Sequence, residues 1–214
     1  MKYLIIPAIV FLMVSCSDDS TDSETTANDQ TSDSTLLEND STNISQEETI
    51  PDAPKIVFHQ YDNKNYKNIG HEMMLTDNIG GIMIGQEMNE VLMILGKASN
   101  VSPEEFWEVD GEFHTFWNYE SLGLTVEFSR FEEYKGSTVV VISLDKNQLS
   151  TAKGVTVGTH RNVILNKYLN EISVEGNEII PEHIMIGDAG FGGLQFTFDN
   201  DTVTNVYLGP IIRC

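Results

Sequence analysis

The sequence Gly81-Ile82-Met83-Ile84-Gly85 recurs as Gly154-Val155-Thr156-Val157-Gly158, 73 positions later. Each copy is followed by residues at i, i+3, i+4 and i+7, the spacing of one face of an amphipathic helix. These residues are Met88, Val91, Leu92 and Leu95 after the first copy, and Arg161, Ile164, Leu165 and Tyr168 after the second. Gly96 stands where a helix after the first copy would end. The recurrence predicts an internal repeat.

After each copy comes a stretch with the period-two alternation that is typical of strands with one buried face, residues 122–128 in the first copy and residues 193–198 in the second. A final strand is predicted after each of them, over residues 138–144 and 202–208. Asp199-Asn200-Asp201 separates the last two stretches and predicts a tight hairpin turn. Each copy therefore predicts a helix followed by antiparallel strands.

This arrangement predicts an α+β fold class with two tandem units, each a helical element packed on an antiparallel β-sheet. We assign the first unit to residues 55–149 and the second to residues 150–214. Because units that share one offset should share a fold, we expect Leu92 and Leu165 at equivalent buried positions.

A wider pattern carries a family resemblance. Gly81 to Gly96 reads Gly-x-x-x-Gly-x-x-x-x-x-Val-Leu-x-x-Leu-Gly and precedes Trp117-x-Tyr119-x-x-Leu122-Gly123-Leu124. This pattern resembles the repeat of β-lactamase-inhibitor-protein-like domains, a group that includes the small outer-membrane-assembly lipoproteins of the BamE type. The resemblance covers residues 79–209 and implies tandem α+β units. The second copy lacks the Trp-x-Tyr step and the helix-end glycine, and nothing matches an inhibitor loop, so β-lactamase inhibition is not implied.

The N-terminus has the layout of an export signal. Lys2 precedes an apolar run from Tyr3 to Val14, which is too short to span a bilayer but suits a signal peptide. Met13-Val14-Ser15-Cys16 resembles the lipobox of bacterial lipoproteins, with methionine in place of the usual leucine. We therefore expect a signal peptide over residues 1–15 and a lipid anchor of diacylglycerol and palmitate on Cys16. The alternative is an ordinary secretory peptide with an incidental cysteine.

The next segment, residues 16–54, is predicted to be a disordered tether. Residues 17–50 contain six Asp and four Glu but no Lys, Arg, Gly or aromatic residue. Such a composition buries too little apolar surface to offset chain entropy. Ser17-Asp18-Asp19 resembles the acidic tag that carries some lipoproteins to the cell surface. We expect an outer-membrane location, with both the periplasmic face and the cell surface left open.

Charge and cysteine content narrow the range of partners. The net charge of -21 argues against nucleic-acid binding and against electrostatic binding to anionic lipid. The chain has two cysteines, so a lipidated Cys16 leaves Cys214 without an intramolecular disulfide partner. The fold must therefore rest on a hydrophobic core.

No motif for catalysis, metal or cofactor binding is apparent. The five histidines lack an HExxH or similar pairing; they are His59, His71, His114, His160 and His183. A cluster of carboxylates resembles a solvated loop around Pro103 and comprises Glu104, Glu105, Glu108, Asp110 and Glu112. The glycine-rich stretch 187–193 favours a hairpin over a phosphate loop, because a strand pattern follows it. We expect no enzyme activity.

Aromatic residues gather in the first copy. The candidate binding residues are Trp107, Phe113, Trp117 and Tyr119, with Phe106 and Phe116 nearby. Strand alternation places Trp117 and Tyr119 on one face and Phe116 on the other. These rings either fill the core or form part of an exposed patch that binds a partner. The sequence thus predicts a non-catalytic envelope lipoprotein that acts as an interaction or assembly module for another envelope protein. The alternative is a surface lipoprotein that binds a glycan or peptide.

Overall fold

The computed structural model describes residues 49–58, 69–173, 177–188 and 192–210. The predicted signal peptide, the lipidation site Cys16, most of the tether and Cys214 lie outside these residues. Within the described ranges, no helix has both the length and the apolar character needed to cross a bilayer.

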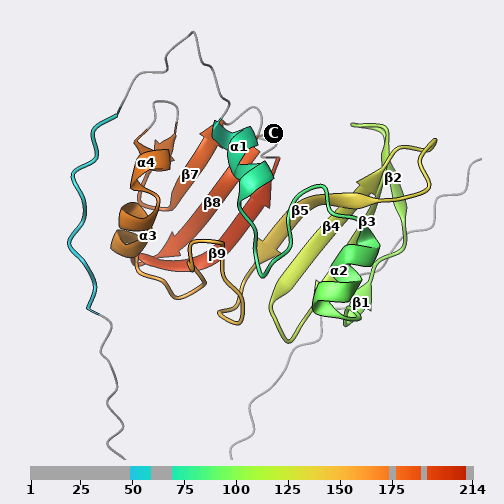
Figure 1. Cartoon of the computed structure of the whole chain (residues 1–214), viewed down its shortest axis with the longest axis horizontal. Coiled ribbons are helices and arrows are strands. Elements are labelled where there is room, and N and C mark those ends of the chain that lie inside the picture. The colour runs from blue at the N-terminus through green and yellow to red at the C-terminus, as the bar shows by residue number, and fades with distance from the viewer. Residues whose placement is uncertain (1–48, 59–68, 174–176, 189–191, 211–214) are drawn as a thin grey trace, which may run out of the picture. The chain divides into compact units, whose positions relative to one another are not determined.

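The elements of the described chain are short helices and longer strands (Figure 1). The helices are α1 (Ile69–Thr76), α2 (Met88–Leu95), α3 (Arg161–Lys167) and α4 (Leu169–Ile172). The strands are β1 (Asn100–Val101), β2 (Glu105–Trp107), β3 (Glu112–Tyr119), β4 (Leu124–Arg130), β5 (Thr138–Leu144), β6 (Glu178–Ile179), β7 (His183–Asp188), β8 (Gly192–Asp199) and β9 (Thr202–Gly209).

All nine strands belong to a single antiparallel sheet. Its order is β1-β3-β4-β5-β9-β8-β7-β6, with β2 paired to β3 at one end. The last strand of each copy of the repeat meets the other at the centre, where Ile142 pairs with Leu208 and Leu144 with Val206. Figure 1 shows the sheet continuing across this β5–β9 junction.

The predicted fold class, two tandem α+β units, is therefore wrong. The chain forms one β-rich sheet with a few short helices and one shared hydrophobic core. The physical reason lies in the edge strands. A sheet confined to either copy would end in β5 or β9, with unpaired N–H and C=O groups exposed along that strand. Pairing residues 142–144 with residues 206–208 provides backbone partners along this part of both edges and merges the cores.

The two faces of the sheet differ in burial. On one face Leu124, Val126 and Phe128 are fully enclosed, and they share the core with Val91 of α2 and Ile164 of α3. Met73, Met74 and Ile172 add α1 and α4 to the same core. Alternate strand residues point the other way, to a face that we call the open face. It carries Phe116, Glu127, Gln195 and Tyr207, which are all partly exposed.

The repeat survives locally, at the turn and helix. Gly85 and Gly158 have φ values of 87° and 89°, and each donates its N–H at 2.8 Å to the first buried residue of the closing strand, Val139 or Val203. The predicted helices are confirmed as α2 and α3, with Gly96 following α2. The hairpin turn is confirmed by positive φ angles at Asn200 and Asp201, as a type I′ turn requires.

The expectation that Leu92 and Leu165 are equally buried is wrong for Leu92. Leu165 is 6% exposed, whereas Leu92 is 43% exposed. α3 is followed directly by α4, whose Ile172 enters the core beside Leu165. α2 ends instead at Gly96 with no second helix after it, and only its Val91 is fully enclosed.

Candidate functional site

The candidate site lies on the open face, where the β2–β3 hairpin meets β4. The hairpin pairs Trp107 with Glu112, and Gly111, at φ 75°, closes its turn by donating its N–H to the carbonyl of Trp107. This turn also carries Asp110. Because neighbours across an antiparallel pair share a face, Trp107 and His114 lie on the same side of the sheet.

His114 is held between two carboxylates. Its Nδ1 lies 2.7 Å from Oε1 of Glu127, and its Nε2 lies 3.0 Å from Oδ2 of Asp110. The indole of Trp107 stacks on the imidazole, with ring centroids 3.9 Å apart and planes within 18°. His114 is only 4% exposed, so both ring nitrogens are committed to these two partners.

A β-bulge opposite Glu127 and Phe128 accompanies this arrangement, with Val140 as the extra residue on β5. A bulge bends its strand and re-aims the neighbouring side chain. Val140 and Val141 are therefore both partly exposed beside Glu127, which reaches the open face by ordinary strand alternation between the enclosed residues Val126 and Phe128.

These residues border a hollow of about 420 Å³ on the open face, which we call the acidic hollow. Its lining comprises Trp107, Asp110, Glu112, His114, Glu127, Ser129, Val140, Val141, Tyr207 and Pro210. The lining contains three carboxylates, and neither Lys nor Arg contributes to it from the described part of the chain. The hollow is thus suited to a positively charged group that can also contact aromatic and aliphatic surface.

Burial and charge perturb two groups in the acidic hollow. Burial raises the pKa of the Glu127 carboxyl, and the hydrogen bond with His114 opposes that rise. Burial, and then the charge of Glu127, raise the pKa of Tyr207 to about 12. The hydroxyl of Tyr207 donates a hydrogen bond of 2.6 Å to the carbonyl of Pro210. A cation in the hollow would relieve the cost of the buried Glu127 charge.

Metal binding has no geometric support in the described ranges, where no three His, Cys, Asp or Glu side chains converge to hold an ion. In the acidic hollow the reason is that His114 offers both nitrogens to Asp110 and Glu127. What the arrangement provides is hydrogen-bond acceptors, negative charge and aromatic surface.

The four aromatic residues predicted as a binding set do not form one patch. Trp107 lies in the acidic hollow. Trp117 is half-buried on the opposite face with its ring 4.8 Å from that of Phe128, and Tyr119 is buried there. The hydroxyl of Tyr119 donates a hydrogen bond of 3.2 Å to the carbonyl of Gly96 at the end of α2.

Phe113 lies on the same face as Trp117, at its outer end. Its ring is 5.1 Å from Phe106, and the guanidinium of Arg130 lies 4.6 Å above it. Arg130 in turn pairs with Glu104 at 2.7 Å. The predicted alternation is confirmed, because Phe116 points to the open face, where its ring lies 6.1 Å from Trp107.

The sequence interpretation missed His114, Glu127 and Tyr207. Its carboxylate cluster supplied Asp110 and Glu112, which were interpreted as part of a solvated loop. Among the other histidines, His160 caps α3 by accepting the N–H of Asn162, and His183 lies 3.1 Å from Glu178. Glu127 occupies a polar position of an alternating strand, as Thr125 and Ser129 do, so it gave no signal of its own. Its pairing with His114 requires the β3–β4 register, which the sequence does not contain.

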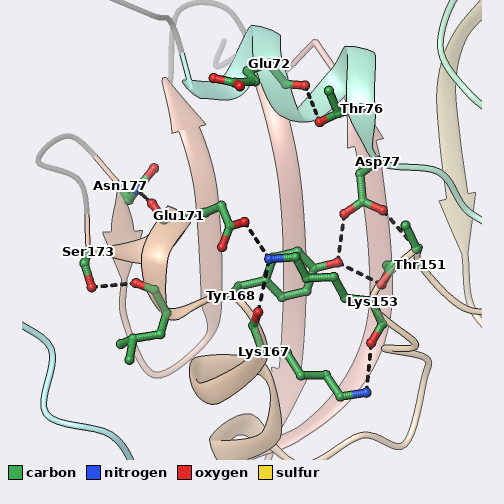
Figure 2. Close-up of polar contacts among 12 residues, drawn as sticks. Glu72, Thr76, Asp77, Thr151, Lys153, Lys167, Tyr168, Glu171, Ser173 and Asn177 are labelled. Atoms are coloured by element: carbon green, nitrogen blue, oxygen red, sulfur yellow. Dashed lines mark hydrogen bonds and ion pairs between the residues drawn. The ribbon is translucent and has the colours of Figure 1, made fainter.

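A second polar cluster lies on the helix-covered face, around the buried ring of Tyr168 (Figure 2). Tyr168 lies 2.8 Å from both Asp77 Oδ2 and Thr151 Oγ1, and it is fully buried. Lys153 bonds Glu171 at 2.5 Å and lies 4.6 Å from the centroid of the Tyr168 ring. Because Asp77, Thr151 and Tyr168 come from three separate segments, this cluster joins segments of the fold.

Comparison with known proteins found no relative of this chain. No family model matches the chain, no curated protein matches it, and no solved structure matches it.

Proposed function

We propose that this protein is a lipid-anchored envelope lipoprotein that binds another envelope protein through the open face of its sheet. The observation that carries the proposal is the acidic hollow on that face, with Trp107 stacked over a buried His114. Within the described chain, the buried residues of all four helices belong to the core on the other face. The open face, where Phe116, Glu127, Gln195 and Tyr207 are partly exposed, is therefore the surface that we expect to meet a partner.

The composition of the open face supports a protein partner. Aromatic residues are enriched at the centres of protein interfaces, and Trp107, Phe116 and Tyr207 stand together around the hollow. Gln195 lies directly opposite Tyr207 on β8 and extends the same face toward the second copy of the repeat. A rim of partly exposed polar side chains around aromatic rings is the usual anatomy of such an interface.

The sequence features outside the described residues complete the proposal. Lipid on Cys16 would attach the chain to the outer membrane, and the acidic segment would hold the sheet away from the bilayer. Membership in the group that includes the BamE-type lipoproteins stays a prediction.

Site-specific photo-crosslinking in intact cells tests the open face. A photoreactive residue is placed at Phe116 or Gln195 on the open face, and at Met93 as a matched exposed position on α2. We expect one adduct of defined size from Phe116 and Gln195, little from Met93, and at least a tenfold loss of adduct when Trp107→Ala is added. Adducts from Met93 alone, or equal adducts from all three positions, would contradict the proposal.

A further inference from the structure

We propose that the acidic hollow is a receptor for the guanidinium group of an arginine side chain on the partner. This inference rests on the proposed function and deepens it by naming the chemistry of the contact. Asp110, Glu112 and Glu127 supply negative charge to the hollow, and His114 bridges two of these carboxylates without adding a free donor.

Unused hydrogen-bond acceptors give an independent reason. Ser129 lines the hollow and is 4% exposed, yet within the described chain its hydroxyl has no hydrogen-bond partner. Glu127 uses Oε1 for His114, while its Oε2 has no hydrogen-bond partner among the described residues. Neither oxygen is sealed in the core like Glu171 Oε2, so both can be reached from the hollow. A ligand rich in N–H donors would satisfy both groups.

Among biological cations, a guanidinium fits these features best. It presents five N–H donors in a plane, always carries its charge, and stacks on aromatic faces. The rings of Trp107 and Tyr207 line the hollow beside the carboxylates, so charge and stacking are available together. The volume of about 420 Å³ accommodates one such side chain and the backbone around it.

The test uses the purified full chain, with Trp117→Phe so that Trp107 is its only tryptophan. Two probes are titrated, N-acetyl-arginine amide and its neutral near-isostere N-acetyl-citrulline amide, and Trp107 fluorescence is recorded. We expect saturable arginine binding with a dissociation constant on the order of 1 mM, the range for one small group. Citrulline should bind at least tenfold more weakly.

Three variants decide which groups are responsible. Glu127→Gln should weaken arginine binding at least tenfold, and Ser129→Ala should weaken it two- to tenfold with little change in the fold. Glu182→Gln removes the same charge at an exposed position outside the hollow, and it should change binding less than twofold. Thermal unfolding of each variant checks that these losses do not come from unfolding.

Equal binding of arginine and citrulline, or no response of Trp107 to either, would overturn the inference. Because Arg213 follows the lining residue Pro210 by three positions, the titration is repeated with Arg213→Gln. Binding that appears only in that variant would identify the chain's own arginine as the occupant and would also overturn it. If arginine did not bind but Phe116 and Gln195 still crosslinked to a partner, the inference about arginine would fail while the proposed function stood. Failure of the two is therefore distinguishable.

Discussion

The hydroxyl of Tyr168 donates a hydrogen bond of 2.8 Å to Oδ2 of Asp77, a residue 91 positions earlier in the chain. The other carboxylate oxygen of Asp77 accepts the backbone N–H groups of Asn78 and Ala152. One carboxylate thus fixes the segment before the first copy of the repeat against the start of the second copy and the α3–α4 junction (Figure 2).

Tyr168→Phe should lower the free energy of unfolding by about 1–3 kcal/mol, because it leaves a buried acceptor without its donor. Urea denaturation measures the change. Tyr134→Phe removes a hydroxyl from an exposed ring and should change the free energy of unfolding by less than about 0.5 kcal/mol. Equal effects of the two substitutions would show that the Asp77 contact contributes nothing specific.

Leu165→Ala and Leu92→Ala should have different costs although they occupy equivalent positions in the repeat. Leu165 is enclosed in the core, so its truncation should cost about 2–5 kcal/mol. Leu92 is exposed, and its truncation should cost less than about 1 kcal/mol. Chemical denaturation of both variants checks this. A large loss at Leu92 would mean that a partner or a second chain covers α2.

The two tryptophans should separate stability from binding. Trp117→Ala removes a half-buried ring packed on Phe128, and we expect a loss of about 2–4 kcal/mol in unfolding free energy, somewhat below the value for a fully buried ring. Trp107→Ala should instead weaken partner binding by at least about 2 kcal/mol, the size of an interface hot spot. Stability and binding are measured on both variants. If partner capture by Trp107→Ala only followed its unfolding, the role of the open face would be refuted.

Alkaline pH should destabilise the fold through Tyr207. Its pKa is raised to about 12 in the folded state, against about 10 in an unfolded chain. The unfolded chain therefore loses this proton first, and the contribution to stability is complete below pH 10 and is lost as the pH rises through about 12. In Tyr207→Phe the free energy of unfolding should fall less steeply between these pH values. If the free energy of unfolding of Tyr207→Phe fell as steeply with pH as that of the unaltered protein, a group other than Tyr207 would be responsible for the loss.

Cys16→Ala tests the predicted anchor. We expect loss of acyl labelling and of membrane fractionation, while thermal unfolding of the chain stays unchanged, because the strands of the described sheet run from Asn100 to Gly209. Labelling with a fatty-acid analogue and cell fractionation measure both effects. Persistent labelling in this variant would disprove the lipidation site.

Local features of this fold were predictable from the sequence, and features that depend on distant pairing were not. The helix starting at Met88, the strand over residues 138–144 and the turn at Asn200 follow from spacing and turn chemistry within a few residues. The pairing of β5 with β9 was not predictable in this way. The sequence of each strand is the same whether the strand ends a separate sheet or pairs with the other copy of the repeat.

The candidate site was hidden for the same reason. From the sequence, Asp110 was interpreted as part of a solvated loop, and His114 as one of five histidines without a metal-binding motif. Their meeting with Glu127 arises from the β3–β4 register, which pairs Phe116 with Glu127 and so brings His114, two residues earlier, beside that carboxylate. The exposure of Leu92 depends in turn on the absence of a second helix after Gly96, which the helical spacing alone did not reveal.

The bulges also determine how many ligands one chain can take. Opposite Glu127 and Phe128, β5 has a bulge at Val140, and opposite Thr197 and Phe198, β9 has the matching bulge at Thr204. Thr197 is therefore the counterpart of Glu127 in the second copy, and it carries no charge. Although the sheet is built from a repeat, it offers its partner one acidic receptor. We expect a binding stoichiometry of one to one, so a chain of this kind can recruit a partner but cannot bridge two copies of it.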